Sequence, residues 1–259
     1  MQRLLHDDFH SQLDTRWRHT HVGGGQILVH AAGLRLLTVG ARRASYSDAQ
    51  IDDYNGLPRR AFPWRPPLRL TLRARASGPL LGTAGFGFWN NPFSPLGGFP
   101  SLPAAVWFFF ASSPSDLPLA AGVAGSGWKC ATIDATTVQA LRWAPLAPPM
   151  ILLNRYPALH ARLWPQIQRD LAIAEAAIPA PDQRWQTYSI EWRSDRVQMF
   201  VDDDVMFDAP FAPRGPLGFV AWVDNQWAVA TPQGRFGWGM LAVPHAQWLD
   251  LAHVAVVPL

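Results

Sequence analysis

The chain has 259 residues, of which 49% are hydrophobic and 16% charged, with a formal net charge of +3. A chain of this length buries a large core, and we expect one domain over residues 1–259. Its basic residues are scattered, which argues against nucleic-acid binding, and no apolar run approaches the roughly 20 residues of a membrane-spanning helix.

The sequence also lacks the common motifs of cofactor and metal sites. Cys130 is the single cysteine, so neither an internal disulfide nor a cysteine-rich metal site can form. The eight histidines make no helical metal motif, and no phosphate-binding loop or dinucleotide fingerprint is present. We therefore expect no cofactor and no bound metal. The residues after Met1 contain too short an apolar stretch for a signal peptide, which predicts a cytoplasmic protein.

Residues 46–56 form the first patterned segment. Alternate residues of a strand share a face, so Tyr46, Asp48, Gln50 and Asp52 would lie together. On a concave face they would form a polar site, in which Asp48, Asp52 and Tyr46 act as acid and base groups and Gln50 binds the ligand. The same oxygens could instead hold calcium, or the segment could be a strand that ends in an Asn-Gly turn.

Residues 68–76 alternate between apolar residues and Arg or Thr, which predicts a strand with one buried face. Aromatic residues then gather in residues 86–93 and 107–110. Most of them would serve the core. Trp89, Asn90 and Trp107 are our candidates for ligand binding, because aromatic faces beside an amide suit an oriented ligand.

One segment departs from the β pattern. Apolar residues at spacings of three and four predict a helix over residues 156–178, inside an insertion of about 150–180, and Pro165 should kink or divide it. The helix would pack outside the β scaffold or form a lid over its concave face.

The remaining segments again predict strands. Residues 185–192 and 197–201 form a hairpin through Ser194 and Asp195, and a second turn at 202–204 leads into 205–207. Residues 218–223 and 249–257 form late strands. Asp224 and Asn225, which follow the first of these, are a turn or a ligand-binding part of the cleft rim.

The C-terminal third resembles the concanavalin A-like lectins and glucanases, especially the laminarinase-like glycosidases of family 16. Those proteins share the run that begins at Trp185 with Tyr188, Ile190, Glu191 and Trp192, and the final strand of residues 248–257. The stretch 102–107 is similar to their W-P-A-x-W element. The resemblance implies a two-sheet antiparallel jelly-roll sandwich, so the expected fold is all-β with a helical insertion.

The chain lacks the catalytic carboxylates that this resemblance would lead us to expect. These glycosidases need two carboxylates on alternate residues of one strand, written E-x-D-x-E. The chain contains only Glu175 and Glu191. We place Glu175 in the predicted helix and Glu191 in the hairpin. After Trp107, where the resemblance puts the motif, phenylalanines follow, so a standard retaining glycosidase is not expected.

Three functions remain open, and the sequence does not decide whether the protein is catalytic. The first is a protein that holds an apolar or aromatic small molecule on the concave sheet, with Asp and Tyr acid–base groups if it is an enzyme. The second is an atypical carbohydrate-binding or carbohydrate-active protein. The third is a non-catalytic interaction domain that docks a partner on its helix. The partner is thus a small molecule or a glycan in the first two cases.

Overall fold

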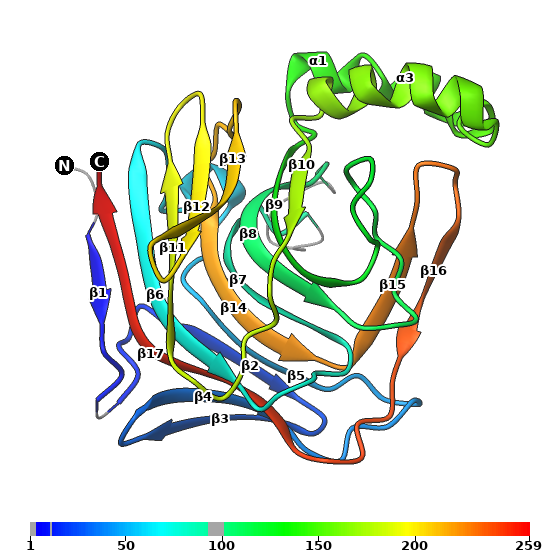
Figure 1. Cartoon of the computed structure of the whole chain (residues 1–259). Coiled ribbons are helices and arrows are strands. Elements are labelled where there is room, and N and C mark those ends of the chain that lie inside the picture. The colour runs from blue at the N-terminus through cyan, green and yellow to red at the C-terminus, as the bar shows by residue number, and fades with distance from the viewer. Residues whose placement is uncertain (1–3, 11, 93–100) are drawn as a thin grey trace.

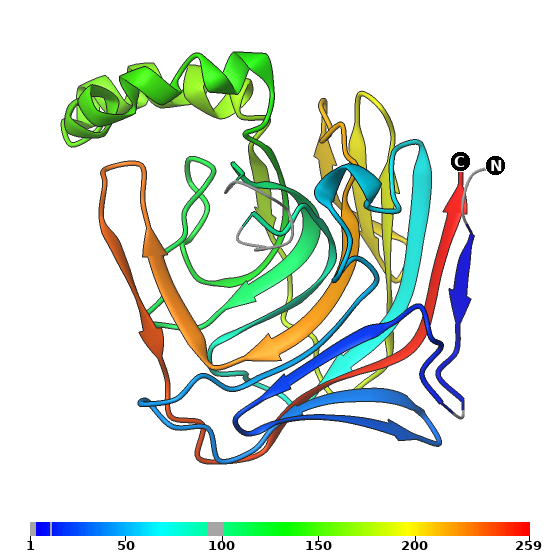
Figure 2. The same cartoon turned by 180° about the vertical axis from the view of Figure 1, so that it is seen from behind.

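The computed structural model describes residues 4–10, 12–92 and 101–259. Its two large antiparallel sheets stack as curved layers, with the helices at one end and both termini beside one edge (Figures 1 and 2). This is the predicted all-β sandwich of the jelly-roll type. None of the helices in the described part of the chain is long and apolar enough to cross a bilayer.

The outer sheet has eight described strands, all of them antiparallel to their neighbours. In order across the sheet they are β13 (Asp204–Ala209), β12 (Val197–Val201), β11 (Gln186–Trp192), β6 (Leu68–Ala76), β17 (Gln247–Pro258), β4 (Gly33–Thr38) and β3 (Gly25–His30), with β1 (Leu5–Asp7) also paired to β17. The predicted hairpin is confirmed, because Tyr188 pairs with Val201 and Trp192 with Val197.

The inner sheet has seven described strands and is strongly curved. Their order is β10 (Ala174–Ala177), β9 (Gly127–Asp134), β8 (Ala104–Ala111), β7 (Thr83–Trp89), β14 (Gly218–Asp224), β5 (Asp48–Asp52) and β2 (Arg18–Val22). A separate hairpin of β15 (Gln226–Ala230) and β16 (Phe236–Met240) rises beside the concave face (Figure 1).

The core lies between the two sheets and is rich in aromatic rings. Phe86 and Phe88 of β7 point into it, where Phe86 meets Tyr188 and Phe88 meets Trp192. Period-two alternation therefore sends the neighbouring Gly85, Gly87 and Trp89 to the opposite, concave side. This division decides which aromatic residues serve the core and which are available to a site.

The helical insertion begins and ends earlier than the predicted 150–180. In the described part of the chain the helices are α1 (Val138–Leu141), α2 (Ala147–Leu153) and α3 (Pro157–Asp170), with 3₁₀ turns at Arg59–Ala61 and Ala144–Leu146. The helix predicted to reach residue 178 ends at Asp170, and Ala174–Ala177 is strand β10. Pro165 does not divide α3: the helix runs through it.

The helical segment is attached at two places around the concave hollow. The Trp164 indole N–H donates to the carbonyl of Leu119, in a loop beside β10. The Arg155 side chain donates to Gln233 O, in the turn between β15 and β16. Figure 1 shows the helices extending between these two flanks above the curved sheet. Apolar side chains including Leu152 and Tyr156 remain exposed on this segment.

Candidate functional site

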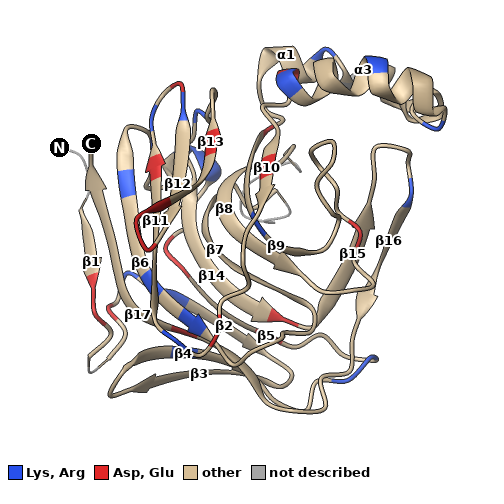
Figure 3. Cartoon of the chain, viewed as in Figure 1, with Lys and Arg blue, Asp and Glu red and all other residues tan. Residues whose placement is uncertain are grey.

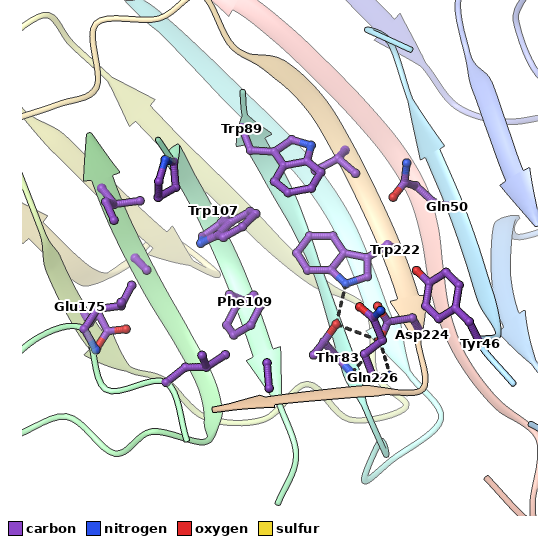
Figure 4. Close-up of a pocket in the computed structure, with 17 residues that line it drawn as sticks. Tyr46, Gln50, Thr83, Trp89, Trp107, Phe109, Glu175, Trp222, Asp224 and Gln226 are labelled. Atoms are coloured by element: carbon purple, nitrogen blue, oxygen red, sulfur yellow. Dashed lines mark hydrogen bonds between the residues drawn. The ribbon is translucent and has the colours of Figure 1, made fainter. Parts of the chain in front are cut away.

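An aromatic floor covers the middle of the concave face. We use this name for Trp89, Trp107, Phe109 and Trp222, which come from β7, β8 and β14 (Figure 4). The Trp107 ring centroid lies 5.7 Å from that of Trp89 and 5.5 Å from those of Phe109 and Trp222. These are ordinary packing distances for aromatic pairs, so the four rings form one continuous surface.

Two glycines of β7 let a ring and the next strand lie close to its backbone. A methyl group at Gly85 would lie 2.4 Å from the Phe108 carbonyl oxygen and 2.8 Å from the Cη2 atom of Trp222, and one at Gly87 would lie 2.6 Å from the Trp107 Cα atom. Gly87 also has φ +147°, which L residues rarely adopt. The missing side chain of Gly85 therefore leaves room for the Trp222 ring, and that of Gly87 allows the backbone of β8 to approach closely.

The substitution Gly85→Ala should displace both the Trp222 ring and the β8 backbone at Phe108, and lower the free energy of unfolding by about 1–3 kcal/mol, the usual cost of overpacking. Denaturant unfolding and near-ultraviolet circular dichroism would measure both effects. Gly237→Ala is the matched control, since its methyl group would stand 3.3 Å from the Trp227 ring, an adjustable contact at a partly exposed hairpin. Equal effects of the two substitutions would contradict the packing argument.

The floor belongs to a pocket of about 410 Å³. Its walls are mostly apolar, and the polar residues lie towards its two sides. The apolar wall residues are Pro103, Leu117, Leu119, Ala131, Ile133, Val220 and Ala228, and the polar ones are Tyr46, Gln50, Thr83, Glu175, Asp224 and Gln226. No residue of α1, α2 or α3 lines this pocket, although Figure 1 shows the helices above the curved sheet.

Two of the tryptophans already have partners for their indole N–H groups. The Trp89 Nε1–H donates to the Tyr54 hydroxyl over 2.6 Å, and the Trp222 Nε1–H donates to the Thr83 hydroxyl over 3.0 Å. These rings therefore offer a ligand their faces rather than their hydrogen-bond donors.

An acidic corner closes the side of the pocket nearest β5. Asp224 and Asp48 are register partners on β14 and β5, and Tyr46 lies beside them (Figure 4). Directly opposed residues have Cβ atoms only about 4.5–5.5 Å apart, so the two carboxyl groups are close neighbours. Both residues are buried, at 3% and 4% exposure.

Asp224 is held by hydrogen bonds to one of its oxygens. Its Oδ1 accepts from the Thr83 backbone N–H, the Thr83 hydroxyl and the Gln226 backbone N–H. Burial nevertheless raises the pKa of Asp224 to about 7, because desolvation outweighs these bonds. A carboxyl group with this pKa can give or take a proton near neutral pH.

Asp48 and Tyr46 are shifted in the same direction. Burial, strengthened by the charge of Asp224, raises the pKa of Asp48 well above its usual range. Its Oδ1 atom is buried without a hydrogen-bond partner. Burial and then the neighbouring Asp48 raise the pKa of Tyr46. A protonated Asp48 beside Asp224 is consistent with two carboxyl groups that cannot both ionise at this spacing.

The alternation predicted for residues 46–52 agrees with this arrangement, because Tyr46 and Gln50 line the pocket with Asp48 beside them. Asp52 has a different place. Its oxygens accept from the Tyr54 and Asn55 backbone N–H groups and from the Gln50 side chain. Asp52 therefore caps the turn after β5, is fully buried, and is not part of the pocket lining.

Of the predicted ligand-binding residues, Gln50, Trp89, Trp107 and Asp224 line the pocket. The structure places Asn90 and Asn225 outside it. The Asn90 amide bonds to Leu102 O and Ala104 N, and the Asn225 amide bonds to Ser47 N and to three backbone carbonyls. Both amides are used to join loops, which removes them from the ligand-binding set.

Glu175 was wrongly placed in a helix by its sequence pattern. It lies on β10 and lines the opposite side of the pocket, where its Oε1 is 3.2 Å from the ammonium nitrogen of Lys129. The Oε2 atom accepts from the backbone N–H groups of Leu119 and Ala120. Burial raises the pKa of Glu175 although Lys129 opposes this. Strand β10 has only four residues, too few for period-two alternation in the sequence to predict a strand there.

The carboxyl groups on the two sides of the floor are not arranged like the catalytic pair of a two-carboxylate glycosidase. Glu175 on β10 and Asp224 on β14 have three strands between them and lie on opposite sides of the floor, whereas hydrolysis needs two carboxyl groups about 5–9.5 Å apart. On β8, where the sequence resemblance places the catalytic strand, the concave positions hold Trp107 and Phe109.

The fold is that of the concanavalin A-like lectins and glucanases. The chain is similar to Crh5 transglycosylase (TM-score 0.53, 12% identity, 98% of this chain and 84% of that chain). It is also similar to the catalytic domain of an endo-1,3-β-glucanase (laminarinase) from Thermotoga petrophila RKU-1 (TM-score 0.51, 10% identity, 97% and 95%).

A third similar structure is the carbohydrate recognition domain of Emp47p (TM-score 0.50, 12% identity, 98% and 94%). At these identities the likeness establishes the shared fold. No protein-family model matches the chain, and no curated protein matches its sequence.

Proposed function

We propose that the protein binds a small molecule with a flat apolar or aromatic face in the concave pocket. The observation that carries this proposal is the aromatic floor, in which three tryptophans and a phenylalanine meet inside mainly apolar walls. A ligand that covers these rings would be stabilised both by the apolar area that is buried and by ring stacking. The acidic corner supplies polar contacts at one end only, which would orient the ligand.

The shortage of free polar groups favours this ligand over a glycan. Glu175 is occupied by Lys129 and two backbone N–H groups, and Thr83 by Trp222 and Asp224. A sugar buried here would leave several hydroxyl groups without partners, and each buried unsatisfied group costs about 1–3 kcal/mol.

A carbohydrate is the second candidate, and the shared fold supports it. Structures of this fold include a transglycosylase in complex with NAG and a carbohydrate recognition domain. Aromatic faces also stack on the apolar faces of sugar rings. A glycan would lie along the hollow between the two polar sides, with Gln50 and Gln226 as hydrogen-bonding groups.

If the protein is catalytic, the acidic corner would perform the chemistry. Asp224, whose pKa burial raises to about 7, would exchange a proton with the bound ligand, while burial keeps the neighbouring Asp48 and Tyr46 protonated. General acid–base catalysis of this kind needs no metal.

Ligand-observed NMR with a set of aromatic and alicyclic fragments, run beside laminari- and chito-oligosaccharides, tests the two candidates. Fragments should bind, and Trp222→Ala should weaken them about tenfold or more, because one stacking surface is lost. Trp238→Ala is the control, since this tryptophan is 74% exposed on β16, outside the pocket. Binding of oligosaccharides alone would replace the first candidate by the second.

A further inference from the structure

A cluster of histidines lies on the far edge of the outer sheet, away from the pocket. It consists of His6, Asp8 and His10 at the N-terminal strand and His253 on β17, which runs beside β1 (Figure 1). The ligating atoms of His6, Asp8 and His253 all lie within 4.8 Å of one another. His10 Nε2 is 3.9 Å from Asp8 Oδ2 but lies outside this group of three, so its exposed side chain would have to turn inward to join them.

Packing against the rest of the protein fixes which side chains of the N-terminal segment point inward. Leu5 and Phe9 are buried at 2% and 0% exposure, and the Asp7 carboxylate accepts from the Trp17 indole and the Phe9 N–H. His6 and His10 are exposed and Asp8 is partly exposed, so all three lie on the solvent side. Only Leu5–Asp7 forms the strand; Phe9 has a positive φ of 55°, and His10 lies in a bend beyond it.

We propose that His6, Asp8, His10 and His253 bind one Zn²⁺ ion. Three imidazoles and a carboxylate form a complete tetrahedral set of the nitrogen and oxygen ligands that this ion prefers. Zinc–ligand bonds of about 2.0–2.2 Å put ligand atoms roughly 3.3 Å apart in a tetrahedron. His253 Nδ1 lies 2.6 Å from Asp8 Oδ1, and His6 Nδ1 and His10 Nε2 each lie 3.9 Å from Asp8 Oδ2. Binding would therefore need side-chain rotations that bring the histidine nitrogens around one ion, with the largest movement at the exposed His10.

The surrounding charges permit a cation. Arg73 is the register partner of His253, but its guanidinium lies 5.7 Å from the Trp185 ring, which precedes β11 on the other side of β6. The cluster is open to solvent, with side-chain exposures from 26% for His253 to 79% for His10, so an ion can enter. With four protein ligands no position stays open for a substrate, and the site would be structural, tying β1 to β17.

Isothermal titration of the untagged, chelator-treated protein with ZnCl₂ tests the proposal. One Zn²⁺ per chain should bind, and His253→Ala or His6→Ala should weaken binding on the order of 100-fold. CaCl₂ should not compete, because calcium prefers oxygen ligands. His245→Ala, which removes an exposed histidine elsewhere, should bind as the unaltered protein does.

A second readout separates a structural ion from loose surface binding. Zn²⁺ should raise the melting temperature of the unaltered protein and of His245→Ala, and it should leave that of His253→Ala unchanged. Co²⁺ in the same site should give the intense visible absorption of tetrahedral coordination. The absence of stoichiometric Zn²⁺ binding, or binding that survives both His6→Ala and His253→Ala, would overturn the proposal.

Discussion

Replacing Lys129 by methionine is expected to lower the free energy of unfolding by about 3–5 kcal/mol, the usual effect of removing one partner from a buried ion pair. The Lys129 and Glu175 side chains are 1% and 2% exposed, so neither charge can turn to solvent. Lys129 also donates to Leu117 O, which fixes the loop that forms one wall of the pocket. Denaturant unfolding of the purified variant would measure the loss.

The double variant Lys129→Met with Glu175→Leu is the control for this prediction. It removes both charges, and buried pairs replaced by apolar residues of similar volume are often as stable as the original. The single variant should also be less impaired at pH 5 than at pH 8, because without Lys129 the pKa of Glu175 rises further and protonation relieves the buried charge. A double variant as unstable as the single one at both pH values would show that lost packing is responsible.

The variant Asp224→Asn should be more stable than the unaltered protein at pH 8, by on the order of 2–4 kcal/mol, and equally stable at pH 4. In the unfolded chain Asp224 ionises near its ordinary pKa, whereas in the fold its pKa is about 7. Between these values the folded state binds more protons than the unfolded state, so stability falls as the pH rises and levels off above pH 7. The stability of Asp224→Asn should not fall with pH in this way, because an amide does not ionise. Its NH₂ group can also donate to Asp48.

Asp53 provides the comparison for this pH dependence. Burial raises its pKa to about 7 as well, although the Trp64 indole N–H and the Phe219 backbone N–H donate to it. Asp53 lies away from the acidic corner, so Asp53→Asn should change the stability profile and leave ligand binding intact. Thermal unfolding from pH 4 to pH 9 would record both variants. A profile of Asp224→Asn parallel to that of the unaltered protein would contradict the assigned pKa.

The sequence predicted the strands at 68–76 and the hairpin at 185–201 from period-two burial, and the jelly-roll sandwich from the resemblance of its C-terminal third. From alternation it also placed Tyr46 and Gln50 on one face, and both line the pocket, whereas it offered Asp224 only as a turn or cleft-rim residue. It could not show that the Asn90 and Asn225 amides would be used up by backbone groups, since those partners come from loops distant in the chain.

Other parts of the structure depend on contacts that no local pattern encodes. The apolar stripe of α3 continues by chance into β10, so its spacing hid the strand that carries Glu175. The pairing of Glu175 with Lys129 joins positions 46 residues apart along the chain. The histidine cluster joins Asp8 to His253, almost the whole length of the chain.

Gly85 of β7 has a consequence for how the pocket can diversify. Because the Trp222 ring lies against the bare backbone of Gly85, a methyl group at position 85 would lift the ring and make the hollow shallower. The same ring donates to Thr83, which donates to Asp224. The thickness of the molecule that fits and the proton chemistry at its end are thus linked through Thr83, so a change at position 85 would alter both.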